Sequence, residues 1–510
     1  MVFHQPADVA SFVIGDPRAG RMVMLSRRHM LAGAIASLGS AAMADAPMRS
    51  YRPVARTAPR EALDGIIARA GLTGQVSVVL GDPTTGRVLE SHSPTIAMPP
   101  ASVTKAITAL YALETLGADH RFITRVLAQG DIRDGILDGH LIVAGGGDPD
   151  LTTDQLADLA QAVQAAGLRE VKGDFLIWDA ALPRLDQIDP SQLPTAGYNP
   201  TISGLNLNYN RVHFEWRREA GNYITAMDAR SDNHRPPVTV ARMQIVNRDL
   251  PVFTYARDGD VDAWTVARSA LNDSGSRWLP VRVPALYAAE VFATFARSKG
   301  IVLGAPRIIA SLPSTTELAR VNSKPMPGLL TDMMRYSTNI TAEALGLTAT
   351  SRISSAPHDL ATSAAGMARW AASRAPGIAP TFVDHSGLGD ASRISAADMV
   401  GFLQAPDVMA RLRPVMRNIN LVDANQNPIS AGQAAVHAKT GTLNFVSALA
   451  GYVRSAAGRD LSFAIFAADL ETRARTRNQS DEVPAGARTW NTRARRLQQD
   501  ILQQWALRAY

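Results

Sequence analysis

The sequence predicts a mixed α/β fold (α+β), and three observations support this prediction. Short apolar runs separated by Gly, Pro and Asn turns indicate strands near both ends of the chain. Longer stretches with apolar residues three or four positions apart indicate helices between and after these runs. Hydrophobic residues make up 46% and charged residues 19% of the 510 residues, so the chain can bury real cores and is long enough for about two to four domains.

The composition excludes several classes of protein. A formal net charge of +6 is mild for this length and argues against a dedicated nucleic-acid binder. Cysteine is absent, which excludes a disulfide scaffold, a cysteine nucleophile and thiolate metal sites. Only five of the 52 basic residues are lysine. Codon bias alone explains an excess of arginine, but arginine stays charged, so chemistry that needs a neutral amine must use one of these five positions.

The first 46 residues are expected to be a signal peptide rather than part of the fold. Arg27 and Arg28 precede the apolar run 30–43, and small residues follow it. The paired arginines resemble those of a twin-arginine signal. The run is shorter than the ~20 residues that span a bilayer, so an uncleaved membrane anchor is the less favoured alternative. We therefore expect an exported protein, periplasmic or otherwise extracytoplasmic, with no stable membrane span. The position of the true start codon stays open.

Residues 47–122 are expected to begin with a helix and to end with a buried one. Apolar residues at helical spacing mark the first, and an alanine- and leucine-rich run that stops before Gly117 marks the last. Between them, two short apolar runs flank a Gly-Asp-Pro turn, which indicates two strands. The expected elements are helix 59–72, strands 75–80 and 87–91, and helix 101–116.

Residues 123–305 differ in pattern from the flanking segments, because short apolar runs alternate with Pro, Asn and Gly turns. We interpret them as inserted material with cores of its own. The expected elements are a hairpin region at 131–138, strands 141–144 and 174–178, helices 153–166 and 285–299, and short strands between 179 and 282. The glycine run 145–147 is interpreted as a structural turn. No Gly-Lys-Ser/Thr follows it, and Asp148 and Asp150 would repel a phosphate.

Residues 306–510 are expected to supply a helix, three successive strands and a closing helix. The expected bounds are helix 329–336, strands 432–441, 445–453 and 461–470, and helix 490–509. A turn rich in small and polar residues joins the last two strands as a hairpin. The closing helix carries Leu497, Ile501, Leu502 and Trp505 on one face, which predicts that this face is buried.

The first motif with chemical meaning is Ser102-Val103-Thr104-Lys105, at the start of the helix 101–116. Residues three apart lie on one helical face, so the Lys105 amine can approach the Ser102 hydroxyl. An apolar helix removes solvent from the amine and lowers its pKa, and a neutral amine can accept the serine proton. The alternative is a lysine whose carbon chain lies along the helix while its amine reaches water.

The second motif is Ser337-Thr338-Asn339, after the helix 329–336. It offers a hydroxyl that can relay a proton and an amide that can hold a substrate amide. By itself this triplet is more often a loop or a helix cap.

The third motif is Lys439-Thr440-Gly441-Thr442, at the end of the strand 432–441. A strand edge can align a peptide through main-chain hydrogen bonds. The lysine and the hydroxyls can bind a carboxylate, and the glycine allows a ligand to approach closely. The alternative is an ordinary β-turn.

Ser-x-x-Lys, Ser-x-Asn and Lys-Thr-Gly, in this order, resemble the signature of penicillin-binding proteins and β-lactamases. Between Lys105 and Ser337 lie more residues than a small β-lactamase has room for. The chain therefore resembles the class C low-molecular-mass penicillin-binding proteins, the S13 D-alanyl-D-alanine carboxypeptidase/endopeptidase family. Segments 139–149, 339–343, 384–388 and 439–452 extend the resemblance over most of the mature chain.

This resemblance implies an architecture. Residues 47–122 and 306–510 would form the two parts of a serine transpeptidase-like domain, with an antiparallel sheet flanked by helices. Residues 123–305 would be one or more domains inserted after the Ser-x-x-Lys helix.

The resemblance also implies an activity, that of a serine DD-peptidase on D-Ala-D-Ala termini or D-Ala cross-links of peptidoglycan. Ser102 would attack the carbonyl and form an acyl-enzyme, Lys105 would accept its proton, and Ser337 would relay a proton to the leaving amine. The expected partners are peptidoglycan peptides, with β-lactam antibiotics as inhibitors that acylate Ser102. No cofactor, metal or nucleic acid is implied.

The resemblance assigns substrate binding to a further set of residues. Backbone N–H groups of Ser102 and Thr442 would form the oxyanion hole. Substrate-binding side chains or backbone would come from Asn339, Lys439, Thr440, Gly441 and Thr442.

The sequence departs from the family pattern at a few places. Thr338 stands where Asp is commoner, at a variable position. His385 stands where Gly is usual, and a surface position is favoured over one on the rim of the cleft. His437 shares a strand face with Lys439, and both substrate contact and a structural role stay open for it.

Two other functions stay open at this point. One is a β-lactamase or esterase of the same fold. The other is a non-catalytic peptidoglycan-binding protein, which a broken motif would mark, and the three motifs are intact.

Overall fold

The structure is a computed structural model that describes residues 61–354, 359–423, 427–429, 432–477 and 482–508. The expected signal peptide, residues 1–46, lies outside these residues. None of the helices within the described ranges has the length and apolar character needed to cross a membrane.

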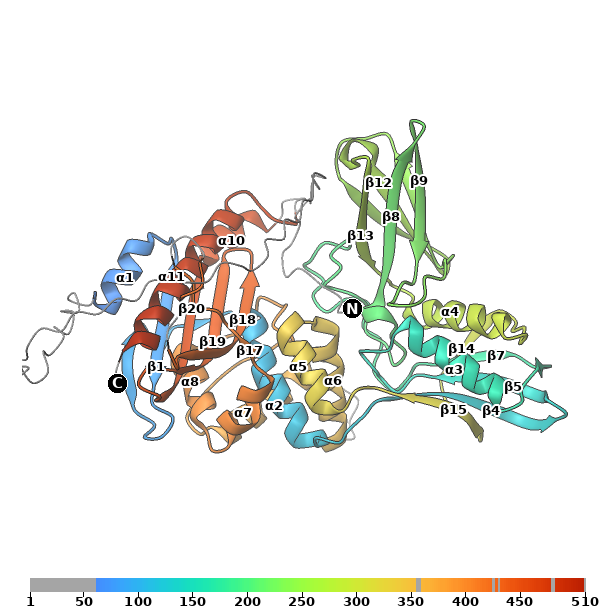
Figure 1. Ribbon diagram of the computed structural model, residues 1–510, viewed down its shortest axis with the longest axis horizontal. Helices are drawn as coiled ribbons and strands as arrows, with labels where there is room; N and C mark the ends of the chain where they lie inside the picture. The colour runs from blue at the N-terminus through green and yellow to red at the C-terminus, as the bar shows by residue number, and fades with distance from the viewer. Residues whose placement is uncertain (1–60, 355–358, 424–426, 430–431, 478–481, 509–510) are drawn as a thin grey trace, which may run out of the picture. The chain divides into compact units, whose positions relative to one another are not determined.

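Six antiparallel strands form the central sheet, in the order β17-β18-β19-β20-β1-β2 (Figure 1). Their bounds are β1 Gln75–Gly81, β2 Val88–His92, β17 Arg417–Asn418, β18 Ala435–Leu443, β19 Val446–Arg454 and β20 Asp460–Ala468. β1 pairs with β20 over its whole length, so strands from distant parts of the chain meet in one sheet. β17 pairs with β18 only at His437 and Ala438. From Lys439 onward, no strand of the described residues pairs with the outer edge of β18.

Both faces of this sheet are buried under helices, because alternate residues of its central strands point to opposite sides. Val78 of β1 packs into the core under α1 (Leu63–Ala70) and α11 (Ala487–Leu507). Its neighbour Val79 packs into the core on the other side. The helices of that side are α2 Thr104–Leu116, α5 Met326–Tyr336, α6 Asn339–Ile353, α7 Leu360–Arg374, α8 Ala396–Gln404 and α9 Val408–Leu412.

Helix α2 lies at the centre of the helical layer. Every residue from Thr104 to Ala112 is buried, because α5, α6, α7 and α9 surround it. A helix that is buried on all sides desolvates any charge that it carries, and Lys105 lies in its first turn. A short 3₁₀ turn, Ala101–Val103, precedes α2 and holds Ser102. Minor elements nearby are β3 Ala97–Met98, which pairs with β16 Ile394–Ser395, and α10 Leu470–Thr476.

A second sheet lies in the long segment after α2, in the order β14-β7-β5-β4-β15, with β6 beside β5. Helices α3 Thr153–Ala165 and α4 Pro284–Ser298 share its core. The strands are β4 Ile123–Arg133, β5 Ile136–Ala144, β6 Glu170–Val171, β7 Phe175–Trp178, β14 Pro306–Ile309 and β15 Thr316–Asn322. β14 and β15 lie beyond residue 305 but pair with β7 and β4. We therefore propose that the inserted segment extends to Asn322.

Two three-stranded sheets complete this segment, in the orders β13-β8-β9 and β10-β12-β11. Their strands are β8 Arg211–Glu219, β9 Asn222–Asp228, β10 Ala241–Val246, β11 Phe253–Asp258, β12 Val261–Ala267 and β13 Ser274–Pro280.

The expected fold class is confirmed: antiparallel sheets and helices combine in a mixed α and β structure. The strand–turn–strand near the start and the last three strands lie within a few residues of their expected bounds. The helix expected at 101–116 differs at its start, because its first three residues form the 3₁₀ turn.

Candidate active site

Ser102 and Lys105 lie side by side at the junction of the 3₁₀ turn and α2. The Lys105 Nζ is 3.0 Å from the Ser102 Oγ. Ala101, just before the serine, has a φ of 46°, a left-handed conformation that is unusual for a residue with a side chain. Such conformations persist where the surrounding structure imposes them, and here the turn is packed between α2 and β18.

The Lys105 amine is completely buried and has three oxygen partners. Besides Ser102, it contacts Asn339 Oδ1 and the main-chain oxygen of Ser386, each at 2.7 Å. Burial lowers the pKa of Lys105 to about 7, although the negative charges of Glu343 and Asp384 act to raise it. Near neutral pH a large share of Lys105 is therefore uncharged, which is the form that can accept a proton.

Lys439 and Ser337 form a second amine–hydroxyl pair across the site. The Lys439 Nζ is 2.9 Å from Ser337 Oγ and 2.8 Å from the main-chain oxygen of Thr440. Burial first, and then the positive charges of Lys105 and Arg417, hold the pKa of Lys439 well below its usual value. Ser337 reaches this position because it adopts a left-handed conformation between the end of α5 and the start of α6.

Asn339, the first residue of α6, connects Lys105 to the inserted segment. Its Oδ1 accepts from Lys105, and its Nδ2 donates to the main-chain oxygen of Tyr198 at 2.8 Å. Apolar contacts beside this bond join Ile188 and Ile202 to α6. The amide expected to hold substrate thus bonds to protein groups on both sides.

β18 runs past Ser102 at close range. A side chain at Gly441 would place its Cβ 2.6 Å from the Pro100 oxygen and 2.9 Å from the Ser102 nitrogen, so only glycine allows this approach. The residues alternate along the strand: Lys439 and Gly441 are buried, whereas Thr440 and Thr442 are exposed. The exposed threonines lie on the part of β18 whose outer edge is unpaired in the described chain.

The structure thus brings all eight expected site residues into one region, from the start of α2, the α5–α6 junction and β18. It also adds residues that carried no expected role. The Ser386 carbonyl accepts a hydrogen bond from Lys105, and the negative charges of Glu343 and Asp384 act on its amine. The sequence held one signal for them: Glu343 lies inside the apolar helix 339–353. An acidic residue at a buried position needs partners, so its presence indicates a polar cluster beside that helix.

The expected surface position of His385 is wrong. Its side chain is completely buried against Glu343 and Ser363. The physical reason is Gly346, where a Cβ would come within 2.1 Å of the imidazole, so the missing side chain provides the space. His437 is half-buried, and its charged neighbours are Arg413, Asp460 and Arg454 rather than the residues near Ser102.

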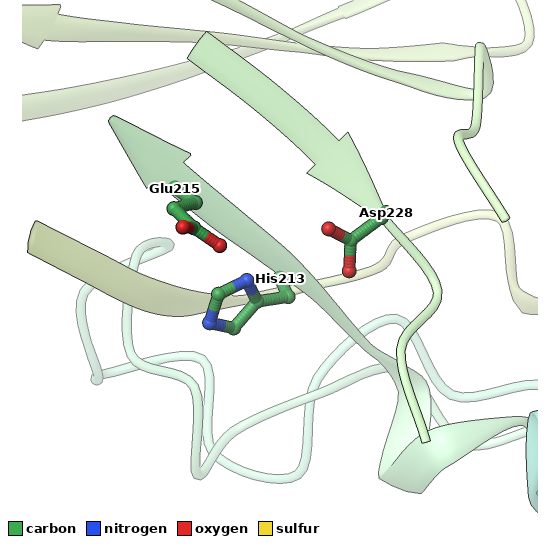
Figure 2. Close-up of side chains that lie close together, drawn as sticks. All are labelled: His213, Glu215 and Asp228. Carbon is green, nitrogen blue, oxygen red and sulfur yellow. The ribbon is translucent and has the colours of Figure 1, made fainter. Parts of the chain in front are cut away.

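One group within the described residues has the composition of a metal site, and it lies in the inserted segment. His213 and Glu215 of β8 and Asp228 of β9 converge, with their ligand atoms within 4.8 Å of one another (Figure 2). Arg230 already bonds both carboxylates, at 2.5 Å to Glu215 and 2.7 Å to Asp228. A guanidinium between two carboxylates accounts for this cluster as an ion-pair network.

Comparison with known proteins gives consistent results. A family model described as the D-Ala-D-Ala carboxypeptidase 3 (S13) family matches residues 60–487. The D-alanyl-D-alanine carboxypeptidase of Actinomadura sp. (strain R39) is 27% identical over 463 residues, which cover 80% of each chain. A carboxypeptidase of Mycobacterium tuberculosis is 26% identical over 432 residues, 81% of each chain. The crystal structure of penicillin binding protein 4 from Haemophilus influenzae superposes with a TM-score of 0.69 at 20% identity, covering 87% of this chain and 100% of that one.

Proposed function

We propose that this chain, which belongs to the D-Ala-D-Ala carboxypeptidase 3 (S13) family, works through an acyl-enzyme on Ser102. The family is that of serine-type peptidases, and its penicillin-binding fold is present here. The observation that carries the proposal is the contact of 3.0 Å between the Ser102 hydroxyl and a completely buried lysine amine.

In the first step, Ser102 Oγ forms a bond to the carbonyl carbon of the penultimate D-Ala. Lys105 in its neutral form takes the serine proton, since its pKa of about 7 leaves it partly unprotonated at neutral pH. Arginine at this position would stay charged and could not do so. Backbone N–H groups of Ser102 and Thr442 are proposed to stabilise the negative charge on the oxygen.

In the second step, the carbon–nitrogen bond breaks and the leaving amine needs a proton. Ser337 is proposed to pass it on, because its hydroxyl bonds the Lys439 amine at 2.9 Å and Lys105 lies across the same site. Water then attacks the ester of Ser102, releases the shortened peptide and restores the free serine.

The substrate is proposed to lie along the unpaired edge of β18, by main-chain hydrogen bonds to the strand. Its terminal carboxylate would meet Lys439, Thr440 and Thr442, since the two threonines are exposed and the lysine amine is close by on the same strand. Gly441 leaves the space between the strand and the Ser102 turn. Asn339 would hold the acyl-side amide once substrate displaces one of its present partners.

Peptidoglycan lies outside the cytoplasm, so the proposal includes export by residues 1–46. Both D-Ala release and cleavage of D-Ala cross-links are proposed activities. β-Lactams are proposed to acylate Ser102. A β-lactam complex of the Haemophilus influenzae protein, with a TM-score of 0.66, supports this step by analogy.

The test is labelling of the purified protein with a fluorescent penicillin, comparing wild type with Ser102→Ala. We expect the label on wild type alone, and equal labelling of the variant would refute the assignment of the nucleophile. Peptidoglycan digestion followed by mass spectrometry then separates lost terminal D-Ala from lost cross-links. Rapid turnover of penicillin without D-Ala release would instead identify a β-lactamase.

A further inference from the structure

A buried carboxylate–imidazole pair lies beside the loop whose Ser386 carbonyl contacts the Lys105 amine. Glu343 of α6 and His385 of the loop before β16 are both fully buried. The His385 Nδ1 is 2.9 Å from Glu343 Oε2. Neither side chain contacts Ser102, so the proposed reaction uses neither of them directly.

Glu343 also holds the backbone of the loop that carries His385. Its Oε2 accepts the N–H of His385 at 3.0 Å, and its Oε1 accepts the N–H of Ser386 at 2.9 Å. The carbonyl of the same Ser386 accepts from Lys105 Nζ at 2.7 Å. Glu343 therefore holds the two peptide groups that come just before the Ser386 carbonyl.

The loop has little freedom to adopt another position. Gly387, with a φ of +75°, approaches so closely that a Cβ would lie 1.8 Å from the Ala101 oxygen, beside the nucleophile. Asp384 accepts the N–H of Gly387 at 2.6 Å. A displacement of the loop at Ser386 would therefore be transmitted both to Lys105 and to the turn that carries Ser102.

The Glu343 carboxylate indicates which nitrogen of His385 carries a hydrogen. An ionised carboxylate can only accept a hydrogen bond, so the Nδ1 atom, 2.9 Å from Glu343 Oε2, must be a donor. On the other side of the ring, Nε2 lies 3.0 Å from the Ser363 hydroxyl, which donates to Thr350 at 2.7 Å. Contacts on both ring nitrogens therefore fix the orientation of the imidazole.

We propose that Glu343 and His385 form a positioning pair for Lys105. Glu343 holds the backbone N–H groups of His385 and Ser386, next to the carbonyl that accepts from the amine, and its negative charge acts on Lys105. His385 holds that carboxylate in place by donating from Nδ1. The proposal rests on the proposed function, since it concerns how the base is held.

Titratable groups from several neighbouring elements lie near the Glu343–His385 pair. Lys105 and Tyr111 belong to α2, Asp384 belongs to the loop, and Lys439 of β18 lies beyond Lys105. Burial acts to raise the pKa of Glu343, but the hydrogen bonds from His385 and Ser386 lower it by more, so the carboxylate stays ionised. Burial and the charge of Glu343 raise the pKa of Asp384 to about 7. Of the two negative charges that raise the pKa of Lys105, that of Glu343 has the larger effect.

The test compares penicillin acylation rates between pH 5 and pH 10 for wild type and Glu343→Gln. The glutamine removes the charge that favours protonated Lys105, so the pH at which acylation is half-maximal should move down by about one unit. The maximal rate should fall about 10-fold, because a charged hydrogen-bond acceptor is lost from the loop. A residue with only a structural role would lower stability and rate but leave the midpoint in place.

A matched pair of variants at His385 tests the second half of the proposal. Asparagine places its amide nitrogen near the position of Nδ1 and keeps a donor for Glu343. Glutamine places its amide nitrogen nearer the position of Nε2 and loses that donor. We expect His385→Asn to acylate within about threefold of wild type and His385→Gln about 10-fold more slowly.

Asp262→Asn is the control, because Asp262 is a completely buried carboxylate of the inserted segment that accepts the N–H of Arg282 at 2.8 Å. It should lower the melting temperature without moving the pH midpoint. An unchanged midpoint for Glu343→Gln, or equal rates for the two His385 variants, would overturn the inference. If Glu343→Gln does not fold, the comparison of His385→Asn with His385→Gln tests the inference by itself. Labelling of Ser102→Ala would count against the proposed function instead, so the two failures are distinguishable.

Discussion

The charged groups around Ser102 and those of the inserted segment have different partners. In the inserted segment, the Arg230 guanidinium bonds the carboxylates of Glu215 and Asp228. Around Ser102, the Lys105 and Lys439 amines bond to hydroxyl, amide and carbonyl oxygens. Within the described part of the chain neither amine forms a salt bridge.

The difference separates charges that are fixed by their partners from charges that can exchange a proton. A guanidinium cannot give up its proton, and a carboxylate partner fixes its charge, so Arg230 and its partners contribute to stability alone. An amine that is buried without a carboxylate in contact loses its preference for the charged state. For Lys105 this brings the pKa to about 7, where it can exchange a proton during a reaction.

The largest effect on the comparison is expected when the Lys105 amine is replaced by a guanidinium, the group that pairs with carboxylates in the inserted segment. Lys105→Arg keeps the positive charge but cannot become neutral, so we expect acylation by penicillin to fall by about 10³-fold. Lys172→Arg is the control, because Lys172 is an exposed lysine of the inserted segment. Stopped-flow acylation measures both variants. A Lys105→Arg rate near that of wild type would exclude Lys105 as the base.

Removing the second amine should have the next largest effect. Lys439→Met takes away the partner of the Ser337 hydroxyl and a charged donor from a buried site, so we expect a loss of about 10² in acylation rate. Lys299→Met, at the end of α4, tests whether losing any lysine has this effect. Equal rates for Lys439→Met and wild type would mean that the Lys-Thr-Gly segment is not part of the site.

A smaller loss is expected when the spacing between the strand and the nucleophile changes. The new Cβ of Gly441→Ala would lie 2.6 Å from the Pro100 oxygen, so the Ser102 turn must move. We expect acylation about 30-fold slower, below the ~10² that a full misplacement of about 1 Å costs. Gly304→Ala is the matched control, because no heavy atom lies within 4 Å of its new Cβ. Unchanged kinetics for Gly441→Ala would show that the close approach has no catalytic role.

The smallest effect on catalysis is expected in the inserted segment. Replacing a charged residue there should lower the stability of the protein rather than its acylation rate. Arg230→Leu leaves Asp228 and Glu215 facing each other without a cation. It should cost about 1–2 kcal/mol of unfolding free energy, because Glu215 is half-exposed and solvent screens part of the interaction. Denaturant unfolding measures this loss. Acylation per folded molecule should stay within about twofold of wild type, and a large drop would mean that the two regions are coupled.

Much of the fold can be predicted from local patterns, because the spacing of apolar residues within one segment indicates whether it forms a strand or a helix. The strand starting at Gln75 and the approach of Lys105 to Ser102 both rest on spacing within one element. The 3₁₀ turn at Ala101 is different, since its left-handed residue is imposed by tertiary packing and no local signal predicts it. The strand β15 likewise depends on its distant partner β4.

The remainder of the site depends on contacts between residues far apart in the chain. Lys439 and Ser337 meet at 2.9 Å across 102 positions, and only the resemblance to a known family anticipated that they share a site. Their catalytic roles stay predictions. The burial of His385 could not be anticipated either, because the space for its ring is the side chain missing at Gly346 in another helix.

The hydrogen bond from Asn339 to Tyr198 limits how such a chain can be shortened during evolution. Excising the long segment after α2 would give a much smaller enzyme, but the amide beside the Lys105 amine would lose its acceptor. A shorter descendant would need a new acceptor at the same point. Because the present acceptor is a main-chain oxygen, we expect the residue type at position 198 to drift among relatives while the path of the backbone there is retained.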